Sequence, residues 1–452
     1  MKRVVIIGAD FAPSSLPPAT RIRFFAKHLP EFGWEPVVLT VAPEYYDRSV
    51  DADNLKLLAD SLEVVRTGAW RSSWTRKLGI SDVGIRSLWN HWQTLKHLCR
   101  ETKIDLVFIP VPPYISMVLG RLAHEKFGIP YVIDYIDPWV TEYYWKLPRN
   151  QRPPKWPLAY AMSRLLEPYA LKRVSHITGV SKGTTDSVVN RYARLGENDA
   201  TEIPYGAEAG DFEYLQLKPR ANPIFNRADG LLHLSCVGAC IPSMHATVRA
   251  LFAAVLLGLE RNPQLFRRLR LHFVGTSYAA NGSAPHNLLA LAREAKIEEY
   301  VTEQASRVPY LDSLQVMVDS AALFLVGSDQ PHYTASKIFP YILAGPPLLA
   351  IFHEASSVVR IIKETEAGHV VTFNSQCPPS TKVTEISDQL ESLLSLPAEF
   401  EPPTNWAAFE EYTTKAMAER LAKVFDRSVN CRVASMDLNA LNQSLSGLRE
   451  KT

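Results

Sequence analysis

Short apolar runs alternate with helical stretches along this 452-residue chain, in two successive series. The runs are rich in Val, Ile and Leu and carry few polar residues, which predicts strands buried on both faces. In the first series they fall at residues 4–7, 37–41, 106–109, 131–133 and 177–180, with helical stretches at 20–32, 114–127 and 184–193. In the second they fall at residues 231–237, 269–274, 322–326, 348–352 and 370–372. Strands that alternate with helices form parallel sheets, so we expect an α/β chain with two doubly wound domains.

The boundary between the series follows Ile203-Pro-Tyr-Gly206, where an irregular, Pro-containing segment interrupts the pattern. A chain of this length exceeds what one hydrophobic core usually serves. We therefore expect a first domain over residues 1–205 and a second over residues 206–400. A long amphipathic helix is predicted over residues 406–425, followed by a polar tail at 429–452.

The bulk composition excludes several classes of function. The net charge of +2 disfavours a dedicated nucleic-acid binder. The five cysteines are scattered without a CxxC or Cys/His group, which argues against a zinc site or a disulfide framework and fits a reducing compartment. The apolar N-terminal run is too short for a signal peptide, and no other segment approaches the roughly 18 apolar residues that span a bilayer. The sequence predicts a cytoplasmic protein.

The segment 333–350 predicts a loop, a short helix opened by Ser336, a turn at Gly345 and a buried strand. Pro340 has no backbone N–H and fits only the first helical turn, which places the helix N-terminus near Ser336 and Lys337. A hydroxyl cap, free amides and an ammonium group together form a receptor for a phosphate. The alternative is a solvated lysine on a short helix.

Two glycines, Gly238 and Gly275, follow strands of the second series and would let the backbone approach a ligand closely. Ligands of doubly wound sheets bind outside the carboxyl ends of the strands, in the cleft where two such sheets face each other. Lys337 would neutralise a diphosphate there and stabilise it as a leaving group. A GxGxxG fingerprint is absent, which disfavours a nicotinamide enzyme.

In the first series, the loop before the first helix ends in Arg21, which is either aimed at a ligand or a solvated residue of a surface turn. The strand at 131–133 leads into Asp137-Pro-Trp139. A carboxylate at this position can take a proton from an acceptor hydroxyl, and an indole face can stack on a sugar. The alternative is that Asp137 caps a turn and Trp139 fills a wall. Ser181 is most simply a helix N-cap.

Residues 141–175 combine basic and aromatic side chains. They hold two acidic residues against seven basic ones, which are Lys146, Arg149, Arg152, Lys155, Arg164, Lys172 and Arg173. They also hold six aromatic residues, Tyr143, Tyr144, Trp145, Trp156, Tyr160 and Tyr169. This mixture is typical of a surface that rests on anionic lipid. The alternative is a partly packed insertion with a solvated rim.

These landmarks, in this order over nearly the whole chain, resemble the GT-B fold glycosyltransferases, close to the family 4-like enzymes of bacterial surface-polysaccharide assembly. The matching motifs are the opening strand and loop to Arg21, Asp137–Trp139, Val180–Gly183, Ile203–Gly206, Gly238, Phe273–Gly275 and Ser336–Ala344. The resemblance implies two Rossmann-like domains facing across a cleft, an acceptor domain followed by a donor-nucleotide domain. It also implies that residues 401–428 return to the first domain.

The chain departs from the family pattern at the donor site. Two glutamates eight positions apart are usual in the family, and His332 and Pro340 stand at those positions here. The Arg and Lys that usually follow the first glycine are also missing, which leaves His245 near Gly238. Either Ser336, Lys337 and His245 hold the diphosphate in this chain and Asp329 or Glu354 supplies a carboxylate to the ribose, or the donor site has decayed.

The resemblance implies a glycosyltransferase that moves a sugar from a nucleoside-diphosphate sugar to a glycan or lipid-linked acceptor in surface-polysaccharide biosynthesis. Catalysis would rest on Asp137 and Lys337, donor binding on Gly238, His245, Gly275, Ser336, Lys337 and Glu354, and acceptor binding on Arg21, Asp137 and Trp139. No metal or cofactor is expected, because no carboxylate pair such as DxD marks a metal-diphosphate site in the second series, and helix amides and Lys337 supply the charge. The alternatives are a non-catalytic sugar-nucleotide-binding protein and an epimerase or hydrolase of the same fold. The enzyme would be cytoplasmic and peripheral to the membrane.

Overall fold

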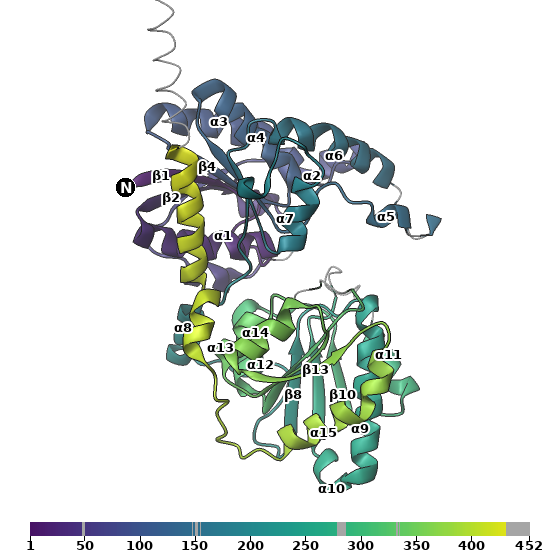
Figure 1. Cartoon of the computed structure of the whole chain (residues 1–452). Coiled ribbons are helices and arrows are strands. Elements are labelled where there is room, and N and C mark those ends of the chain that lie inside the picture. Colours follow the sequence, from purple (N-terminus) through teal and green to yellow (C-terminus); the bar gives the residue numbers. More distant parts are fainter. Residues whose placement is uncertain are drawn as a thin grey trace, which may run out of the picture. The chain divides into compact units, whose positions relative to one another are not determined.

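The computed structural model describes residues 1–47, 50–146, 148–149, 152–153, 155–277, 286–330, 333 and 335–430. The chain forms two compact units, which are described separately here. The first consists of Met1–Tyr205 together with the chain from Thr414, and the second of Gly206–Thr413. Figure 1 labels the elements of both units. Residues 401–413 thus belong to the second unit, and the returning segment begins at 414 rather than at 401.

The described part of the first unit contains a seven-stranded parallel sheet in the order β3-β2-β1-β4-β5-β6-β7. Its strands are β1 (Lys2–Ile7), β2 (Trp34–Val41), β3 (Glu63–Thr67), β4 (Leu106–Val111), β5 (Tyr131–Tyr135), β6 (His176–Gly179) and β7 (Ala200–Glu202). The strand order reverses between β1 and β4. In sheets of this kind the loops at the carboxyl ends of the two central strands diverge and leave room for a ligand.

Helices cover both faces of this sheet. The helices of the first unit are α1 (Pro17–His28), α2 (Ser72–Thr75), α3 (Val83–Glu101), α4 (Met117–Phe127), α5 (Tyr143–Lys146), α6 (Trp156–Leu171), α7 (Lys182–Val189) and the helix at residues 414–430. Side chains of α3, α4, α6 and α7 pack on one face of the sheet. Side chains of α1 and of the helix 414–430 pack on the other. The sheet is therefore buried on both faces, as its apolar strands require.

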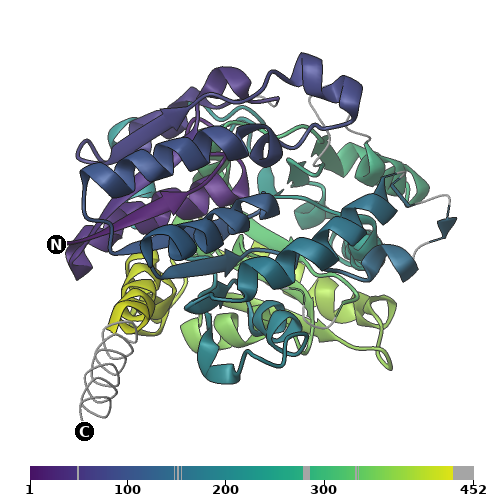
Figure 2. The same ribbon diagram turned by 90° about the horizontal axis from the view of Figure 1, so that it is seen from above.

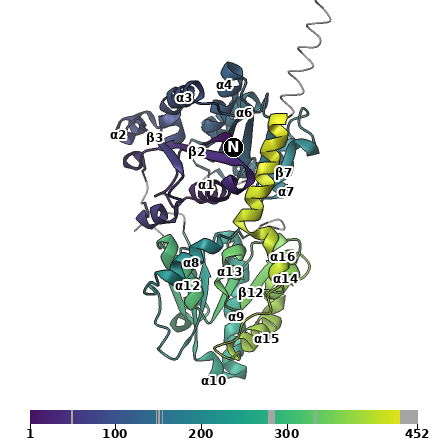
Figure 3. The same cartoon turned by 90° about the vertical axis from the view of Figure 1, so that its left-hand side faces the viewer.

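The helix 414–430 completes the first unit although it follows the whole of the second in sequence (Figures 2 and 3). The ring of Phe425 meets the rings of Trp34 and Phe108 edge to face, at centroid distances of 5.1 and 5.2 Å. The resemblance predicted this return. The prediction of one continuous helix over 406–425 is wrong, because the chain forms α16 (Trp406–Phe409) and a 3-10 turn (Glu410–Tyr412) and is extended at Thr413.

The described part of the second unit contains a six-stranded parallel sheet in the order β10-β9-β8-β11-β12-β13. Its strands are β8 (Leu232–Val237), β9 (Leu269–Val274), β10 (Val301–Gln304), β11 (Ala322–Val326), β12 (Leu348–His353) and β13 (Gly368–Phe373). The order reverses between β8 and β11, which is the switch point of this sheet.

The helices of the second unit form two layers (Figure 1). The central helix α9 (His245–Arg261) packs with α10 (Pro263–Phe266), α11 (Asn287–Glu294) and α15 (Val383–Leu394). Helix α12 (Tyr310–Asp319) packs with α8 (Ala209–Leu217) and α13 (Ile338–Ala344), and α14 (Ser357–Thr365) packs with α16. Together these elements enclose the sheet and place the loops after its strands along one edge.

Among the described residues, one helical segment, Pro242–Arg261, is long and apolar enough to cross a membrane by length and composition alone. The expectation that no segment approaches these properties is therefore wrong. The segment includes α9, and residues such as Val248, Leu251 and Val255 lie in the core of the second unit. This packing accounts for its apolar composition without a membrane.

The sequence predicted ten of the strands and missed β3, β7 and β10. The strand β10 reads Val-Thr-Glu-Gln, and β7 reads Ala-Thr-Glu. All three lie at sheet edges, where one side of the strand carries no neighbour. Edge strands are short and polar because they meet solvent, so they lack the apolar run that identifies a central strand.

Candidate functional site

The switch point of the second sheet brings Gly238 and Lys337 together. Gly238 directly follows β8, and Lys337 lies in the connection between β11 and α13. A Cβ placed on Gly238, whose φ is +146°, would lie 3.4 Å from Cγ of Lys337. Both the backbone conformation and the close approach of Lys337 favour glycine at this position. The predicted proximity of these two residues is thus present in the structure.

Tyr341 fixes α13 against the end of β8. Its hydroxyl donates to the carbonyl oxygen of Val237 at 3.2 Å and accepts from the amide of the same residue. Its side chain is fully buried. Because Tyr341 lies one turn after Lys337, this bond sets the position of the lysine beside Gly238. No sequence pattern indicates this role, since a buried tyrosine resembles any other core residue.

The details of the α13 N-terminus differ from the prediction. The helix begins at Ile338 with Lys337 at the N-cap position, and no side chain caps it. The expectation that the Ser336 hydroxyl opens the helix is wrong, and Ser336 is exposed in a turn. Pro340 does lie in the first turn, and Gly345 ends the helix with φ of +96°. His332 lies outside the described residues.

Lys337 is a half-buried cation, and no carboxylate among the described residues pairs with it. Burial, reinforced by the positive charge of Arg307, lowers the pKa of Lys337 to about 8. Arg307 comes from the loop between β10 and α12, and its Cα lies 3.8 Å from the Cβ that a side chain at Gly275 would carry. Two cations and two glycines therefore meet at this edge, an arrangement suited to an anion.

Arg307 was not singled out from the sequence. Arg307 lies in the loop that follows β10, and the sequence did not predict this polar edge strand. Gly275 has φ of +73° and lies directly after β9, the neighbour of β10. The carboxyl ends of three adjacent strands thus supply Gly238, Gly275 and Arg307.

His245 opens α9, which follows β8. Burial and the nearby charge of Arg249 lower the pKa of His245, so the imidazole is neutral at neutral pH. Its Nε2 atom is buried and has no hydrogen-bond partner among the described residues. A neutral imidazole at this edge can donate or accept one hydrogen bond to a ligand.

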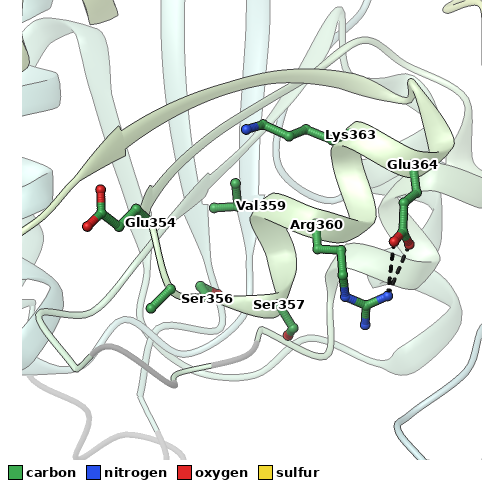
Figure 4. A pocket seen from close by; sticks show the side chains of 8 residues that line it. Glu354, Ser356, Ser357, Val359, Arg360, Lys363 and Glu364 are labelled. Carbon is green, nitrogen blue, oxygen red and sulfur yellow. Dashed lines mark hydrogen bonds and ion pairs between the residues drawn. The ribbon is translucent and has the colours of Figure 1, made fainter.

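Glu354 lies at the carboxyl end of β12, beside a pocket of about 510 Å³ along α14 (Figure 4). Its carboxylate accepts a hydrogen bond from the side-chain amide of Asn374 at 3.1 Å. The pocket is also lined by Val359 and Lys363, which project toward the same side as Glu354 in Figure 4. The structure therefore places Glu354 directly after β12, the strand next to β11, with its side chain exposed.

In the first unit, Asp137, Trp139 and Tyr114 gather near the switch point. Trp139 stacks on Tyr114 with a centroid distance of 5.5 Å and an interplanar angle of 7°. One face of the Trp139 indole is therefore already occupied by Tyr114. Asp137 reaches solvent, but the protein around it displaces enough water to raise the pKa of its carboxyl group. Among the described residues no donor pairs with this carboxylate, which suits a general base.

Arg21 has surroundings that differ from those predicted for an acceptor-binding residue. Its side chain is 2% exposed, and its guanidinium binds both carboxylate oxygens of Asp134, at 2.6 and 2.9 Å. It also donates to the carbonyl oxygens of Ile203 and Pro204, at 2.7 and 3.1 Å. These bonds engage the guanidinium with groups inside the first unit. Arg21 therefore ties the backbone at Ile203 and Pro204 to Asp134 of β5, and it does not point at a ligand.

Residues 18–206 match the sequence profile of the glycosyl transferase 4-like domain. The matched region is less than half of the chain. It covers the first unit from α1 to the boundary at Tyr205 and includes Asp137 and Trp139. No curated protein matches the chain in sequence.

Solved structures of glycosyltransferases resemble the whole chain in fold. HepE from Anabaena in complex with UDP is 14% identical, with a TM-score of 0.52 and coverage of 97% of this chain and 100% of that chain. A UDP-forming α,α-trehalose-phosphate synthase from Burkholderia xenovorans is 12% identical, with a TM-score of 0.57 and coverage of 94% and 99%. WaaG, a glycosyltransferase involved in lipopolysaccharide biosynthesis, is 13% identical, with a TM-score of 0.52 and coverage of 95% and 98%.

At these identities the likeness is one of fold. The chain has the GT-B fold, as the sequence resemblance predicted. Among the described residues, no group of three or more His, Cys, Asp or Glu side chains is arranged to hold a metal ion.

Proposed function

We propose that this protein is a glycosyltransferase that transfers a sugar from a nucleoside-diphosphate sugar to a glycan or lipid-linked acceptor in surface-polysaccharide biosynthesis. The glycosyl transferase 4-like domain and the GT-B fold support the reaction class. The solved structures named above include one complex with UDP, that of HepE, so UDP is the first nucleotide to test. The proposed enzyme acts at the cytoplasmic side of a membrane.

The observation that carries the proposal is the unpaired, half-buried Lys337 beside Gly238 and Arg307. Burying an ammonium group without a carboxylate costs free energy, which an anionic ligand would recover. In the proposal, Lys337 and Arg307 bind the diphosphate, and Gly238 and Gly275 let the backbone approach it. These cations stabilise the charge that develops on the leaving diphosphate, so the proposal invokes no metal ion.

The proposed acceptor side is the edge of the first sheet at Asp137. A carboxylate with a raised pKa and no hydrogen-bond donor is suited to take the proton of an acceptor hydroxyl. Trp139 and Tyr114 form an aromatic wall beside it. In the proposal, Arg21 has no direct contact with the acceptor, because its guanidinium is bound to Asp134 and to two carbonyl groups.

One observation favours a second candidate, a sugar-nucleotide-binding protein without catalytic activity. Helix α13 contains no carboxylate, and Pro340 stands where the resembling family has a glutamate. Glu354 is the replacement that the proposal uses for the ribose contact. Its bond to Asn374 leaves one carboxylate oxygen available for a ribose hydroxyl.

The test combines donor binding with turnover for the wild type and for Asp137→Asn. We expect UDP and UDP-sugars to raise the melting temperature of both proteins equally. We expect the variant to transfer or hydrolyse the donor sugar about 100–10,000-fold more slowly, the usual contribution of a general base. The matched control is Asp60→Asn, which changes an exposed aspartate that precedes the amino end of β3 and so lies away from the carboxyl ends of the strands.

The outcomes separate the candidates. Donor binding with no transfer to glycan or lipid-linked acceptors, and no hydrolysis, would establish the non-catalytic protein. Absence of any shift with a panel of sugar nucleotides would contradict both candidates. Equal turnover by Asp137→Asn and Asp60→Asn would retain the enzyme but remove Asp137 from its mechanism.

A further inference from the structure

The outer face of α6 is apolar and exposed. Leu158 and Leu165 are 69% and 72% exposed, and Ala161 and Tyr169 are also exposed at helical spacing from them. Residues three and four positions apart share one face of a helix, so these side chains form a continuous stripe. A single exposed leucine is ordinary in a soluble protein, but a stripe of this kind indicates an interaction surface.

The inner face of α6 carries the polar contacts. The carboxylate of Glu167 is fully buried, where Arg191 donates to it at 2.9 Å and the hydroxyls of Tyr192 and Tyr135 donate at 2.7 and 3.2 Å. A surface helix usually places its charged residues toward solvent and its apolar residues toward the core. In α6 a carboxylate lies inside while two leucines lie outside. Packing within the first unit does not explain why these two leucines are exposed.

Positive charge accompanies the apolar stripe. Arg164 lies within α6 beside Leu165, and Lys172 and Arg173 follow the last turn, and all three are exposed. Residues 141–175 contain two acidic side chains, and one of them, Glu167, is buried and neutralised by Arg191. Glu142 is thus the exposed acidic residue of this segment. A cationic surface of this composition complements an anionic partner.

Aromatic rings lie at the N-terminal end of α6. Trp156 contacts Tyr160 and Tyr144 with centroid distances of 5.1 and 4.6 Å, and Trp145 is 48% exposed. The guanidinium of Arg152 lies over the Trp145 ring at 5.4 Å. Amphipathic rings with neighbouring cations are typical of the headgroup layer of a membrane, where one part of the ring meets lipid and another meets water.

We propose that the outer face of α6, defined by Leu158, Leu165 and Tyr169 with Arg164, Lys172 and Arg173, binds the surface of an anionic lipid bilayer. The leucines would enter the acyl boundary while the basic side chains extend to the headgroups. An apolar helix face flanked by exposed basic side chains is the pattern of a helix that lies on an anionic bilayer. The proposal does not depend on the transfer reaction.

The same helix is tied to the proposed acceptor edge. Arg191, which binds Glu167, also donates to the backbone carbonyl of Val140 at 2.7 Å. Val140 directly follows Trp139 in the loop that carries Asp137. In a parallel sheet the helix that follows a strand begins at the carboxyl edge, so the N-terminus of α6 lies at the edge that carries Asp137. If the proposed function holds, the bilayer-bound face would present this edge to a lipid-linked acceptor.

The test is flotation of the full chain with vesicles of phosphatidylcholine alone and with 30% phosphatidylglycerol, without donor or acceptor. We expect binding to the anionic vesicles and a decrease as salt rises, because exposed charges are screened. Two variants address the two components, Leu158→Ser/Leu165→Ser and Arg164→Glu/Lys172→Glu/Arg173→Glu. We expect each to lower binding at least tenfold, since one basic residue contributes roughly fivefold at an anionic surface.

Matched controls change the same residue types in the second unit. Leu217→Ser removes a leucine that is 82% exposed, and Lys218→Glu/Arg267→Glu reverses two exposed charges. We expect both controls to bind as the wild type does. All changed side chains are exposed, so unchanged circular dichroism and melting temperature should confirm that the variants are folded.

Three results would overturn the proposal. The first is no binding to anionic vesicles, and the second is equal binding to neutral vesicles or equal binding by the α6 variants. The third is self-association of the wild type that Leu158→Ser/Leu165→Ser abolishes in the absence of lipid, which would assign the face to a second copy of the chain. None of these results depends on turnover, so they leave the proposed function to be tested separately.

Discussion

Arg21 and Lys337 are two cations at the carboxyl edges of two parallel sheets, and they differ in what neutralises them. Arg21 is fully buried, and Asp134 balances its charge with two short bonds. Burial alone would lower the pKa of Arg21, but the adjacent carboxylate outweighs that effect and raises it. Lys337 is half-buried beside another cation, and its pKa is lowered.

The difference shows how two cations at the carboxyl edges of parallel sheets acquire different roles. A charge that the fold neutralises itself contributes to the stability of the unit and is no longer available to a ligand. A charge that no residue of the fold neutralises can still interact favourably with a ligand of opposite charge. Four predictions test this contrast, in order of decreasing effect.

Replacing Arg21 should destabilise the first unit strongly. Arg21→Met leaves the Asp134 carboxylate buried with the hydroxyl of Thr178 as a remaining donor, at 2.7 Å. Breaking a buried pair from one side typically costs about 3–5 kcal/mol of unfolding free energy. Urea unfolding followed by tryptophan fluorescence reports mainly on this unit, because eight of the nine tryptophans lie within residues 1–205.

The control for Arg21 is Arg100→Met, which changes an exposed arginine on α3 and should alter stability by less than about 0.5 kcal/mol. If Arg21→Met lost donor or acceptor binding without losing stability, the assignment of Arg21 to stability rather than to ligand binding would be wrong. That result would mean that the arginine serves a ligand after all.

Replacing Lys337 should impair activity and leave the stability of the free protein intact. Lys337→Ala should lower turnover about 100–1000-fold, the range for removal of one group that stabilises developing negative charge. It should also diminish the UDP-induced rise in melting temperature. The melting temperature of the free protein should not fall, because the variant removes a charge that burial disfavours.

Lys218→Ala, an exposed lysine of the same unit, is the matched control and should behave as the wild type. If Lys337→Ala retained full UDP affinity, the diphosphate would have to bind elsewhere.

Two glycine variants sharpen the placement of the site. Gly238→Ala and Gly230→Ala both introduce a Cβ at positive φ, +146° and +80°, and each should cost about 1–3 kcal/mol of backbone strain. The Cβ at Gly238 would also meet Lys337, whereas nothing lies within 4 Å of the Cβ at Gly230. Titration calorimetry should therefore show weaker UDP binding by Gly238→Ala alone. Equal affinities would argue that Gly238 lies outside the site.

The smallest effect is a pH dependence of UDP affinity. Lys337 is protonated below a pKa of about 8, so its contribution to anion binding is complete at pH 6.5 to 7 and declines as the pH rises through 8. The decline should be at most about tenfold per pH unit, the limit for loss of one proton. Lys337→Ala should remove the pH dependence between pH 7 and 9. A pH dependence that persists in the variant would identify another titrating group.

The sequence predicted the two sheets well because their central strands are apolar on both faces. It located the switch-point residues Gly238 and Lys337 through turn chemistry and the proline at position 340. It missed Arg307 because the preceding strand is polar and lies at a sheet edge. It also misread Arg21, since the partner that neutralises it, Asp134, lies 113 positions away in sequence. Local patterns reveal which residues form a strand or a turn, but not which distant charge will be buried beside them.

The return of residues 414–430 to the first unit has a consequence for biosynthesis. Until the ribosome has made these residues, Trp34 and Phe108 lack the ring of Phe425 that covers them. The apolar face of the nascent first unit therefore stays uncovered while the ribosome translates the entire second unit. A stop codon placed before position 414 would remove less than a tenth of the polypeptide and still leave its earliest-made half without a finished core.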